Sequence, residues 1–467
     1  MSRPYLDRLF APRSVALIGA SRDKTSVGFG IAENLVFGAV MKSASSSPFE
    51  GDVFFINPHA DEILGRKCLT SILKVPKAID LAVIAVPAKV VPAVLEECGK
   101  KKVPFAIIIS AGFNESGGDD LSDLTMKVAK RQGIRLIGPN CLGLLRPQTH
   151  LNASFAPSMP KAGPVAFISQ SGALADSVID WALDEGYGFS GIVSIGNALD
   201  LGFADLLEFF SQDPHTKVIT LYIEGLHDGR RFYHHLKAAT AKKPVVILKA
   251  GRTAASQKAI GSHTASLSGD FAVFTAAIEQ AGGILVDSVE DLFDMGKALA
   301  WQPPLRHGRV AIVTNAGGPG VVCADWCSRL GLEVVPLEQS TIKKLDATKV
   351  MSPAYSRSNP LDLVGDALPH QYEAVIMTFL GEKYIDGIIV IQTIQTMTQS
   401  LEDAMVVVKA KQRFPDKPII CLYMGGRFSR KAIHLLEAHG IPDYNDPRNA
   451  ALAMHALFVA GSNKKRR

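Results

Sequence analysis

A single histidine, His263, stands among small and hydroxyl-bearing residues in the stretch 249–271, KAGRTAASQKAIGSHTASLSGDF. Neutral imidazole can act as a nucleophile near neutral pH. The flanking Gly261 and Ala265 leave room for a ligand to approach the backbone. Two interpretations stay open at this point: a loop that carries a reactive histidine, or an ordinary surface loop rich in Gly, Ser and Thr.

Two further segments could meet this histidine. Ser169, Gln170, Ser171 and Gly172 stand between a strand expected over 165–169 and a helix expected over 173–185, where amide and hydroxyl donors suit an oxyanion. The alternative is a plain serine N-cap. Glu224 follows a strand expected over 218–223, and a carboxylate can orient a histidine or stabilise its cation. Together these groups indicate a phosphorylated histidine, although a solvated glutamate is the simpler interpretation of Glu224 alone.

Composition favours a soluble α/β protein. The chain has 467 residues, 47% of them hydrophobic and 20% charged, with a net charge of +5. This length predicts two to four domains. Part of the charge lies in the basic tail 464–467, so we expect no nucleic-acid binding. The six cysteines form no CxxC pair, which predicts reduced thiols, no metal site and a cytoplasmic location. We expect neither a signal peptide nor a membrane span.

Aliphatic strands alternate with helical patterns along the first third of the chain. Strands are expected over 14–21, 52–57, 81–86, 105–110 and 135–137, with helices over 29–37, 90–100 and 121–132. The first strand ends at Gly19 in a turn that could cradle a phosphate or simply allow close packing. A dinucleotide site would place an acid after the second strand, whereas Asn57 and Pro58 stand there, which disfavours NAD.

The pattern restarts twice. After a proline-containing segment, 146–163, interpreted as a linker, strands are expected over 165–169, 191–194, 218–223 and 245–249. The third restart, near Gly308, contains the NAGGPG turn at 315–320 and strands over 309–314, 332–336, 387–393 and 418–424. These repeats predict three serial α/β domains with doubly wound parallel sheets.

Eight motifs in order resemble the alpha subunit of ADP-forming acetyl-CoA synthetase, an acid:CoA ligase related to succinyl-CoA synthetase. They are VALIGASR near the start, INP at 56–58, SAGF at 110–113, GPNCLG at 138–143, FISQSGALA at 167–175, YIEG at 222–225, GSHTASLSG at 261–269 and NAGGPGV at 315–321. The resemblance covers nearly the whole chain.

This resemblance implies a Rossmann-like CoA-binding domain over 1–145, a flavodoxin-like domain with the phosphohistidine over 146–304, and a third flavodoxin-like domain over 305–467. It implies reversible conversion of acyl-CoA, ADP and phosphate to a carboxylic acid, ATP and CoA. His263 would be the phosphohistidine, Glu224 its acidic partner, and Ser169–Gly172 the phosphate-receiving helix start. The residues implied to line coenzyme A are Gly19, Ala20, Ser21, Arg22, Pro58, Val86, Pro87, Ser110, Ala111, Gly112 and Asn140.

The chain departs from the family pattern at three places. His59 stands where the family often has a lysine, residues 41–49 resemble an insertion, and no ATP-grasp segment is found. ADP or ATP with Mg2+ would therefore bind a separate ATP-grasp beta subunit, in an α2β2 assembly. A non-catalytic subunit that senses CoA or acyl-CoA is the alternative, and an NAD-dependent oxidoreductase is a third. The loop 196–200 is a candidate for the acyl pocket.

Overall fold

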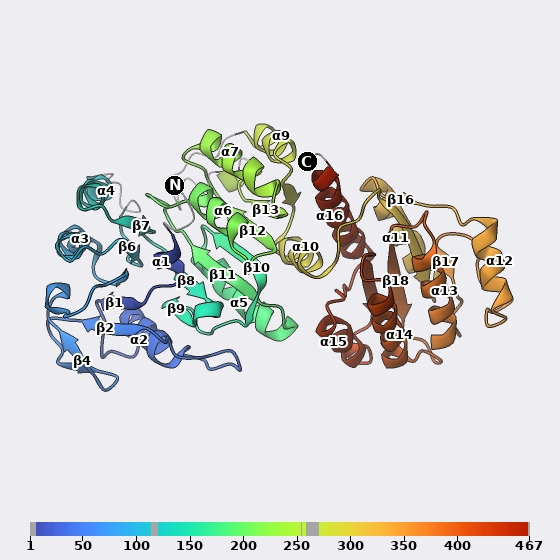
Figure 1. Ribbon diagram of the computed structural model, residues 1–467, viewed down its shortest axis with the longest axis horizontal. Coiled ribbons are helices and arrows are strands. Elements are labelled where there is room, and N and C mark those ends of the chain that lie inside the picture. The colour runs from blue at the N-terminus through green and yellow to red at the C-terminus, as the bar shows by residue number, and fades with distance from the viewer. Residues whose placement is uncertain (1–5, 114–119, 254, 258–269, 466–467) are drawn as a thin grey trace. The chain divides into compact units, whose positions relative to one another are not determined.

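The computed structural model describes residues 6–113, 120–253, 255–257 and 270–465, with side chains through 462. The chain falls into two compact units, 1–285 and 286–467. Figure 1 shows two sheets in the first unit and one in the second, each flanked by helices. Among the described residues, no helix combines the length and apolar character needed to cross a bilayer.

The first sheet has seven strands in the order β3-β4-β2-β1-β5-β6-β7. Its central strands pair in parallel, and only β3 and β4 pair in antiparallel. The central strands are buried because they are runs of aliphatic residues covered on both faces. The elements are α1 (Asp7–Phe10), β1 (Ser14–Ile18), α2 (Val27–Phe37), β2 (Asp52–Ile56), β3 (Glu62–Ile63), β4 (Arg66–Leu69), β5 (Leu81–Ile84), α3 (Val91–Lys100), β6 (Phe105–Ile108), α4 (Asp120–Gln132) and β7 (Arg135–Ile137).

The second sheet also has seven strands, in the order β14-β13-β12-β10-β11-β8-β9. Its parallel part continues into an antiparallel edge made by β8 and β9. The elements are β8 (Gly143–Arg146), β9 (Leu151–Ser154), β10 (Ala162–Ser169), α5 (Gly172–Glu185), β11 (Phe189–Ser194), α6 (Phe203–Gln212), β12 (Val218–Ile223), α7 (Gly229–Thr240), β13 (Val245–Lys249), α9 (Phe271–Gln280) and β14 (Ile284–Val286).

The linker prediction for 146–163 was wrong. This segment holds the end of β8, a 3-10 turn (Pro147–Thr149), all of β9 and the start of β10. The domain boundary expected between 145 and 146 thus falls inside β8. The prolines around these short strands conceal them in the sequence, because proline usually marks a loop.

The two sheets of the first unit share one hydrophobic core. Leu17 and Phe105 of the first sheet belong to the same buried cluster as Ile168 and Val193 of the second. Asn34, fully buried on α2, donates to the carbonyl oxygens of Ser154 and Ala156, both at 2.8 Å. Helix α2 is therefore fastened to β9.

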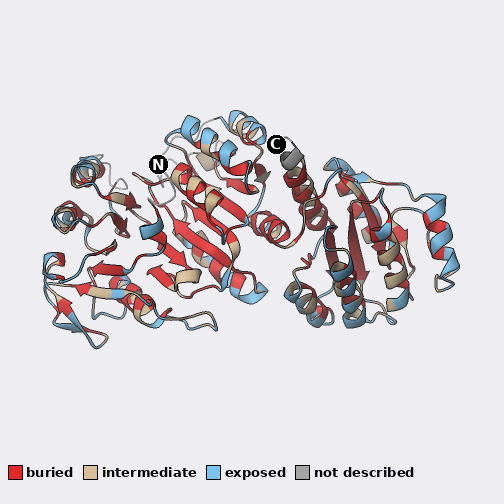
Figure 2. Ribbon diagram, viewed as in Figure 1, coloured by how far each residue is buried: buried red, intermediate tan, exposed pale blue. Residues whose placement is uncertain are grey.

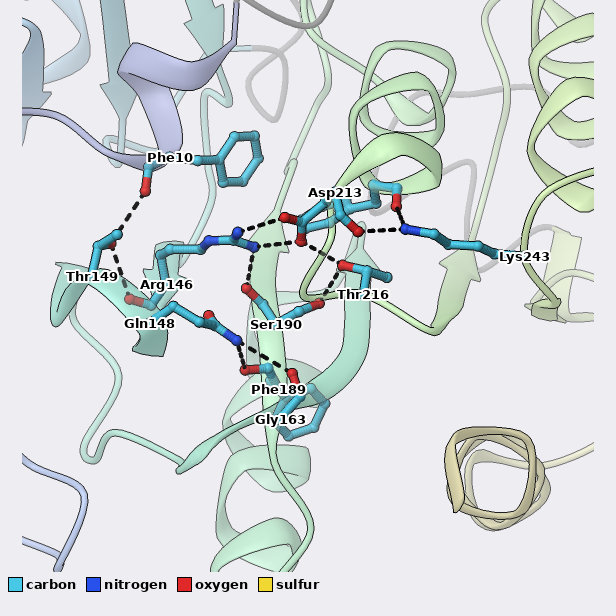
Figure 3. A network of polar contacts seen from close by, with 11 residues as sticks. Phe10, Arg146, Gln148, Thr149, Gly163, Phe189, Ser190, Asp213, Thr216 and Lys243 are labelled. Carbon is cyan, nitrogen blue, oxygen red and sulfur yellow. Dashed lines mark hydrogen bonds and ion pairs between the residues drawn. The ribbon is translucent and has the colours of Figure 1, made fainter. Parts of the chain in front are cut away.

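A buried ion pair anchors the start of the antiparallel edge (Figure 3). The Arg146 guanidinium contacts the Asp213 carboxylate at 2.9 and 3.0 Å and donates to the Ser190 carbonyl. Thr216 donates to the same carboxylate at 2.6 Å. Burial alone would raise the pKa of Asp213, but the hydrogen bonds from Arg146 and Thr216 hold that pKa below its ordinary value.

The second unit is built on a five-stranded sheet with the path β16-β15-β18-β19, and β17 pairs with β15. Figure 2 shows its strands buried and the outer faces of its helices exposed. The elements are α10 (Val289–Trp301), β15 (Arg309–Thr314), α11 (Gly317–Arg329), β16 (Glu333–Val334), α12 (Gln339–Ala347), β17 (Leu361–Asp362), α13 (Pro369–Gly381), β18 (Gly387–Thr393), α14 (Ser400–Arg413), β19 (Ile419–Met424), α15 (Arg430–Ala438) and α16 (Pro447–Lys465). The predicted fold class, three α/β sheets dominated by parallel strands, is confirmed.

Candidate active site

A cavity of about 560 Å³ lies within the first unit. Loops that follow β5, β6 and β7 of the first sheet form one part of its wall, and the start of α5 in the second sheet forms another. The predicted site residues on this wall are Val86, Ser110, Ala111, Asn140, Gln170, Ser171 and Gly172. The cavity therefore brings the expected CoA loops and the expected phosphate-binding turn together.

The turn after β1 is packed too tightly for side chains at two glycines. Gly19 has φ +92°, and a Cβ there would lie 2.2 Å from the Ala85 carbonyl oxygen. A Cβ on Gly28 would lie 2.1 Å from the Gly19 carbonyl oxygen. These positions require glycine because neighbouring backbone cannot move aside cheaply. The turn after β1 is thus packed closely against the loop that follows β5 and against the start of α2.

The remaining residues expected at CoA lie around this turn or just outside the lining. Asn57 donates to the Ala20 carbonyl oxygen at 2.7 Å and accepts from the His59 amide at 2.7 Å. Arg22 donates to the His59 carbonyl oxygen at 3.4 Å. An exposed arginine therefore lies beside the position where the family pattern has lysine. The expected CoA residues outside the cavity lining are Gly19, Ala20, Ser21, Arg22, Pro58, Pro87 and Gly112.

The start of α5 is a capped helix N-terminus. The Ser171 hydroxyl accepts from the Leu174 amide at 3.2 Å, and the Ser169 hydroxyl accepts from the Ser171 amide at 3.0 Å. Gly172 and Ala173, in the first helical turn, line the cavity. First-turn N–H groups have no partner within the helix and favour an anion. The serine N-cap interpretation is thus correct for Ser171, and it leaves these amides able to receive a phosphate.

Gln170 links this turn to the segment that carries Glu224. Its side-chain oxygen accepts from the amides of Glu224 and Gly225 at 2.6 and 3.0 Å, and its side-chain nitrogen donates to the Gly225 carbonyl oxygen at 3.0 Å. Glu224 itself is only 6% exposed. Gln170 therefore fixes Glu224 relative to the helix start. His263 lies outside the described residues.

Lys249, at the end of β13, also contacts Glu224. Its ammonium group donates to the Glu224 carbonyl oxygen at 2.7 Å. Burial lowers the pKa of Lys249, and the nearby negative charge of Glu224 partly opposes that change. Burial, the charge of Glu224 and a hydrogen bond to Glu224 raise the pKa of Tyr222 to about 12. Glu224 thus interacts with both Lys249 and Tyr222.

Asp176 and Lys249 lie at the candidate site, and the sequence reasoning did not name them as candidates. Asp176 lines the cavity on α5, and burial raises its pKa to about 6. An acid four residues inside an amphipathic helix resembles any solvent-facing acid, so no sequence signal identifies it. A lysine that ends an otherwise aliphatic strand could have identified Lys249.

The loop 196–200 does not contribute to the lining of the large cavity. Its Ala198 and Asp200 border a separate cavity of about 90 Å³, together with Gln170 and His227. Asp200 pairs with Arg135 at 2.7 Å and so ties this loop to β7. The candidate acyl pocket at 196–200 stays a prediction without geometric support from the large cavity.

Three family models match the chain in series. They are the CoA binding domain at residues 13–147, the succinyl-CoA ligase like flavodoxin domain at 162–299 and the ligase-CoA domain at 310–459. The expected order of domain types along the chain agrees with these matches, although the exact boundaries stay predictions.

Curated relatives of two lengths match. The alpha subunit of acetate–CoA ligase [ADP-forming] II from Pyrococcus furiosus is 38% identical and aligns over 98% of both chains. Acetate–CoA ligase [ADP-forming] I from Archaeoglobus fulgidus is 40% identical over 97% of this chain, and the ligase from Methanocaldococcus jannaschii is 43% identical over 96%. This chain spans 63% and 62% of the length of those two relatives.

A solved structure has the same fold over nearly its whole length. It is the dinucleotide forming acetyl-coenzyme A synthetase 1 of Ca. Korarchaeum cryptofilum in complex with phosphate and ADP, with a TM-score of 0.92, 36% identity and coverage of 99% of this chain and 98% of that chain. With the near-complete alignment to the Pyrococcus subunit and the three family models in the same order, this shows that the chain belongs to the family of ADP-forming acetate–CoA ligase alpha subunits.

Proposed function

We propose that this chain is the alpha subunit of an ADP-forming acyl-CoA synthetase that acts in the cytoplasm. It converts acyl-CoA, ADP and phosphate reversibly to a carboxylic acid, ATP and CoA. The observation that carries the proposal is the single cavity lined both by the loops expected to hold CoA and by the first turn of α5. The thioester and the phosphate can meet there without leaving the first unit.

The reaction divides into three balanced steps. Phosphate attacks the thioester carbonyl, the C–S bond breaks, and acyl phosphate and CoA form. His263 then takes the phosphoryl group and releases the carboxylate. ADP finally takes the phosphoryl group from phospho-His263 and becomes ATP. Covalent transfer conserves the free energy of the thioester that direct hydrolysis would waste.

Each proposed group has a role that its surroundings support. Val86, Ser110, Ala111 and Asn140 contact CoA, and the turn at Gly19–Arg22 with Pro58, Pro87 and Gly112 completes its site. Ser169–Gly172 receives the phosphate with first-turn amides. Glu224 positions His263 and stabilises its cation, and Gln170 and Lys249 hold Glu224 in place.

A partner completes the enzyme in this proposal. The partner is an ATP-grasp beta subunit that binds ADP or ATP with Mg2+, in an α2β2 assembly. The name of a relative supports it: the Pyrococcus furiosus protein that aligns over 98% of both chains is named a subunit alpha. A CoA-sensing subunit is not favoured, because a sensor has no use for Glu224 held beside a phosphate-binding turn.

Labelling with radioactive ATP tests the proposal. The chain is incubated with a candidate ATP-grasp partner, and we expect an acid-labile, base-stable label that His263→Ala abolishes. His434→Ala, an exposed histidine on α15, is the matched control and should retain the label. Two outcomes would contradict the proposed activity. One is a label that persists in His263→Ala, and the other is the absence of label with every candidate partner in a mixture that binds CoA.

A further inference from the structure

Asp176 occupies an unusual place for a carboxylate. It lies four residues after Gly172 on α5, about one turn along the helix, and it lines the large cavity. Among the described residues that line this cavity, Asp176 is the only acid. Its neighbours on the wall include the apolar side chains of Val27, Leu142 and Phe155.

One oxygen of this carboxyl group, Oδ1, is buried and has no hydrogen-bond partner among the described residues. Burial is also the cause that raises the pKa of Asp176 to about 6, and no neighbouring charge contributes to that change. Oδ1 itself is shielded, so a bound molecule meets the part of the side chain that lines the cavity. Burial disfavours the ionised form of this carboxyl group, and a hydrogen-bond donor on a bound molecule would stabilise that form.

The reaction chemistry indicates which molecule this is. The argument rests on the proposed function: the thioester carbonyl must lie between CoA, held by the loops at Val86 and Ser110, and the phosphate at Gly172. The acyl group extends from that carbonyl into the same cavity. Asp176 is the acidic side chain on the cavity wall that this acyl group would meet.

We propose that Asp176 determines the acyl specificity of this chain, favouring acyl groups that end in a hydroxyl and rejecting acyl groups that end in a carboxylate. The hydroxyl donates to the Asp176 carboxylate, whereas a second carboxylate places two like charges in a largely apolar cavity. Like charges brought together in this way cost several kcal/mol, and they discriminate between ligands of equal size.

Three CoA thioesters of equal chain length test this inference. Propionyl-CoA, 3-hydroxypropionyl-CoA and malonyl-CoA end in a methyl, a hydroxymethyl and a carboxylate group. Their binding to the full chain is measured by calorimetry at pH 7.5, where Asp176 is ionised, and each Kd is divided by that of free CoA. We expect the hydroxylated thioester to bind about tenfold more tightly than propionyl-CoA and malonyl-CoA to bind most weakly.

Two substitutions separate charge from hydrogen bonding. Asp176→Asn keeps the shape and an acceptor but removes the charge, so the disadvantage of malonyl-CoA should shrink about tenfold. Asp176→Ala should abolish the preference for the hydroxyl group. Asp180→Asn, an exposed acid one turn further along α5, is the matched control and should keep the ratios of the unmodified chain.

Equal ratios in the unmodified chain, Asp176→Asn and Asp176→Ala would overturn the inference while the proposed function stands. Failure of free CoA to bind the unmodified chain would instead contradict the proposed function, and the inference would fall with it. Thermal unfolding of each variant identifies any loss of folding, and Asp176→Asn is the variant least prone to it because its shape is preserved.

Discussion

Two glycines in the turn after β1 allow backbone segments to approach within the space that a methyl group would fill. Gly19 and Gly28 face each other closely, whereas a Cβ on Gly30, in the same helix, would meet nothing within 4 Å. The strand and glycine pattern of the sequence predicted this turn, but it left open whether a phosphate cradle or close packing was responsible. The structure shows that these glycines allow neighbouring backbone segments to pack closely.

Replacing Gly28 with alanine should therefore be damaging, because its Cβ would lie 2.1 Å from the Gly19 carbonyl oxygen. We expect CoA affinity to fall at least about tenfold and stability to fall by about 1–3 kcal/mol, as in an overpacked core. Gly30→Ala should keep CoA binding and stabilise α2 by up to about 1 kcal/mol. Calorimetry measures the CoA affinity of each variant, and thermal unfolding measures its stability. Equal effects of the two substitutions would contradict this account.

Gln170 carries a second prediction at the scale of a single residue. Gln170→Ala removes the acceptor of the Glu224 and Gly225 amides, so Glu224 loses its fixed position. We expect phosphorylation of the chain by ATP and its partner to slow about tenfold or more while CoA affinity changes little. Gln148→Ala, a glutamine that also bonds backbone but outside the cavity lining, is the control. A parallel loss in both variants would indicate general destabilisation.

The elements of the two parallel sheets were predicted well, whereas the antiparallel edge was not. Strands such as β5 and β12 are largely aliphatic runs followed within three residues by Pro87 or Gly225, so the pattern identifies them directly. Strands β8 and β9 have four residues each and lie among prolines. Arg146, the last residue of β8, pairs with Asp213, 67 residues away in sequence. No local pattern contains that information.

The Arg146–Asp213 pair supplies a prediction at this scale. Arg146→Ala leaves a buried carboxylate without its partner, so we expect a loss of about 3–5 kcal/mol in the free energy of unfolding. Lys77→Ala, which breaks the exposed pair with Asp52, should cost less than about 1 kcal/mol. Denaturant titration compares them. A loss below 1 kcal/mol for Arg146→Ala would contradict this role.

The same pair responds to pH. The folded-state pKa of Asp213 is lowered. The pair's contribution to the free energy of unfolding is therefore present above the unfolded-state pKa of about 3.9, and it is lost as the pH falls below that pKa.

At the scale of the molecule, the sequence predicted three α/β repeats, and three sheets are found. It did not predict that the first two sheets form one unit. That union depends on contacts such as Asn34 with Ser154 and on the stacking of Phe10 on Phe209, whose ring centroids lie 4.0 Å apart. Residues this far apart in the sequence produce no periodic pattern from which their contact could be predicted.

The second unit should have a pH response of the opposite sign. Asp403 is 1% exposed, and burial raises its pKa to about 7 although a hydrogen bond from Gln392 opposes the change. The folded unit holds a proton that the unfolded chain releases above a pKa of about 3.9. Stability should therefore fall as the pH rises from about 4 to about 7, by on the order of 2–4 kcal/mol.

Asp403→Asn should make this dependence less steep, because asparagine has no charge to bury, while the buried Asp443, whose pKa is raised to about 8, keeps part of it. Asp366→Asn, an exposed acid in the same unit, is the control and should leave the slope unchanged. Hydrogen exchange of peptides from 286–467 between pH 5 and 8 measures the slope for this unit alone. A slope unaltered by Asp403→Asn would contradict the assignment.

The amide of Asn34 has a consequence for how any phosphoryl group could travel. It joins the helix beside the CoA loops to the edge strand of the neighbouring sheet through two 2.8 Å bonds inside a common core. A hinge that opened between these halves would have to expose that amide and tear apart the shared interior. In the proposed reaction, we therefore expect the walls of this cavity to keep their relative positions, so that transfer of a phosphoryl group to another site does not require the cavity to open.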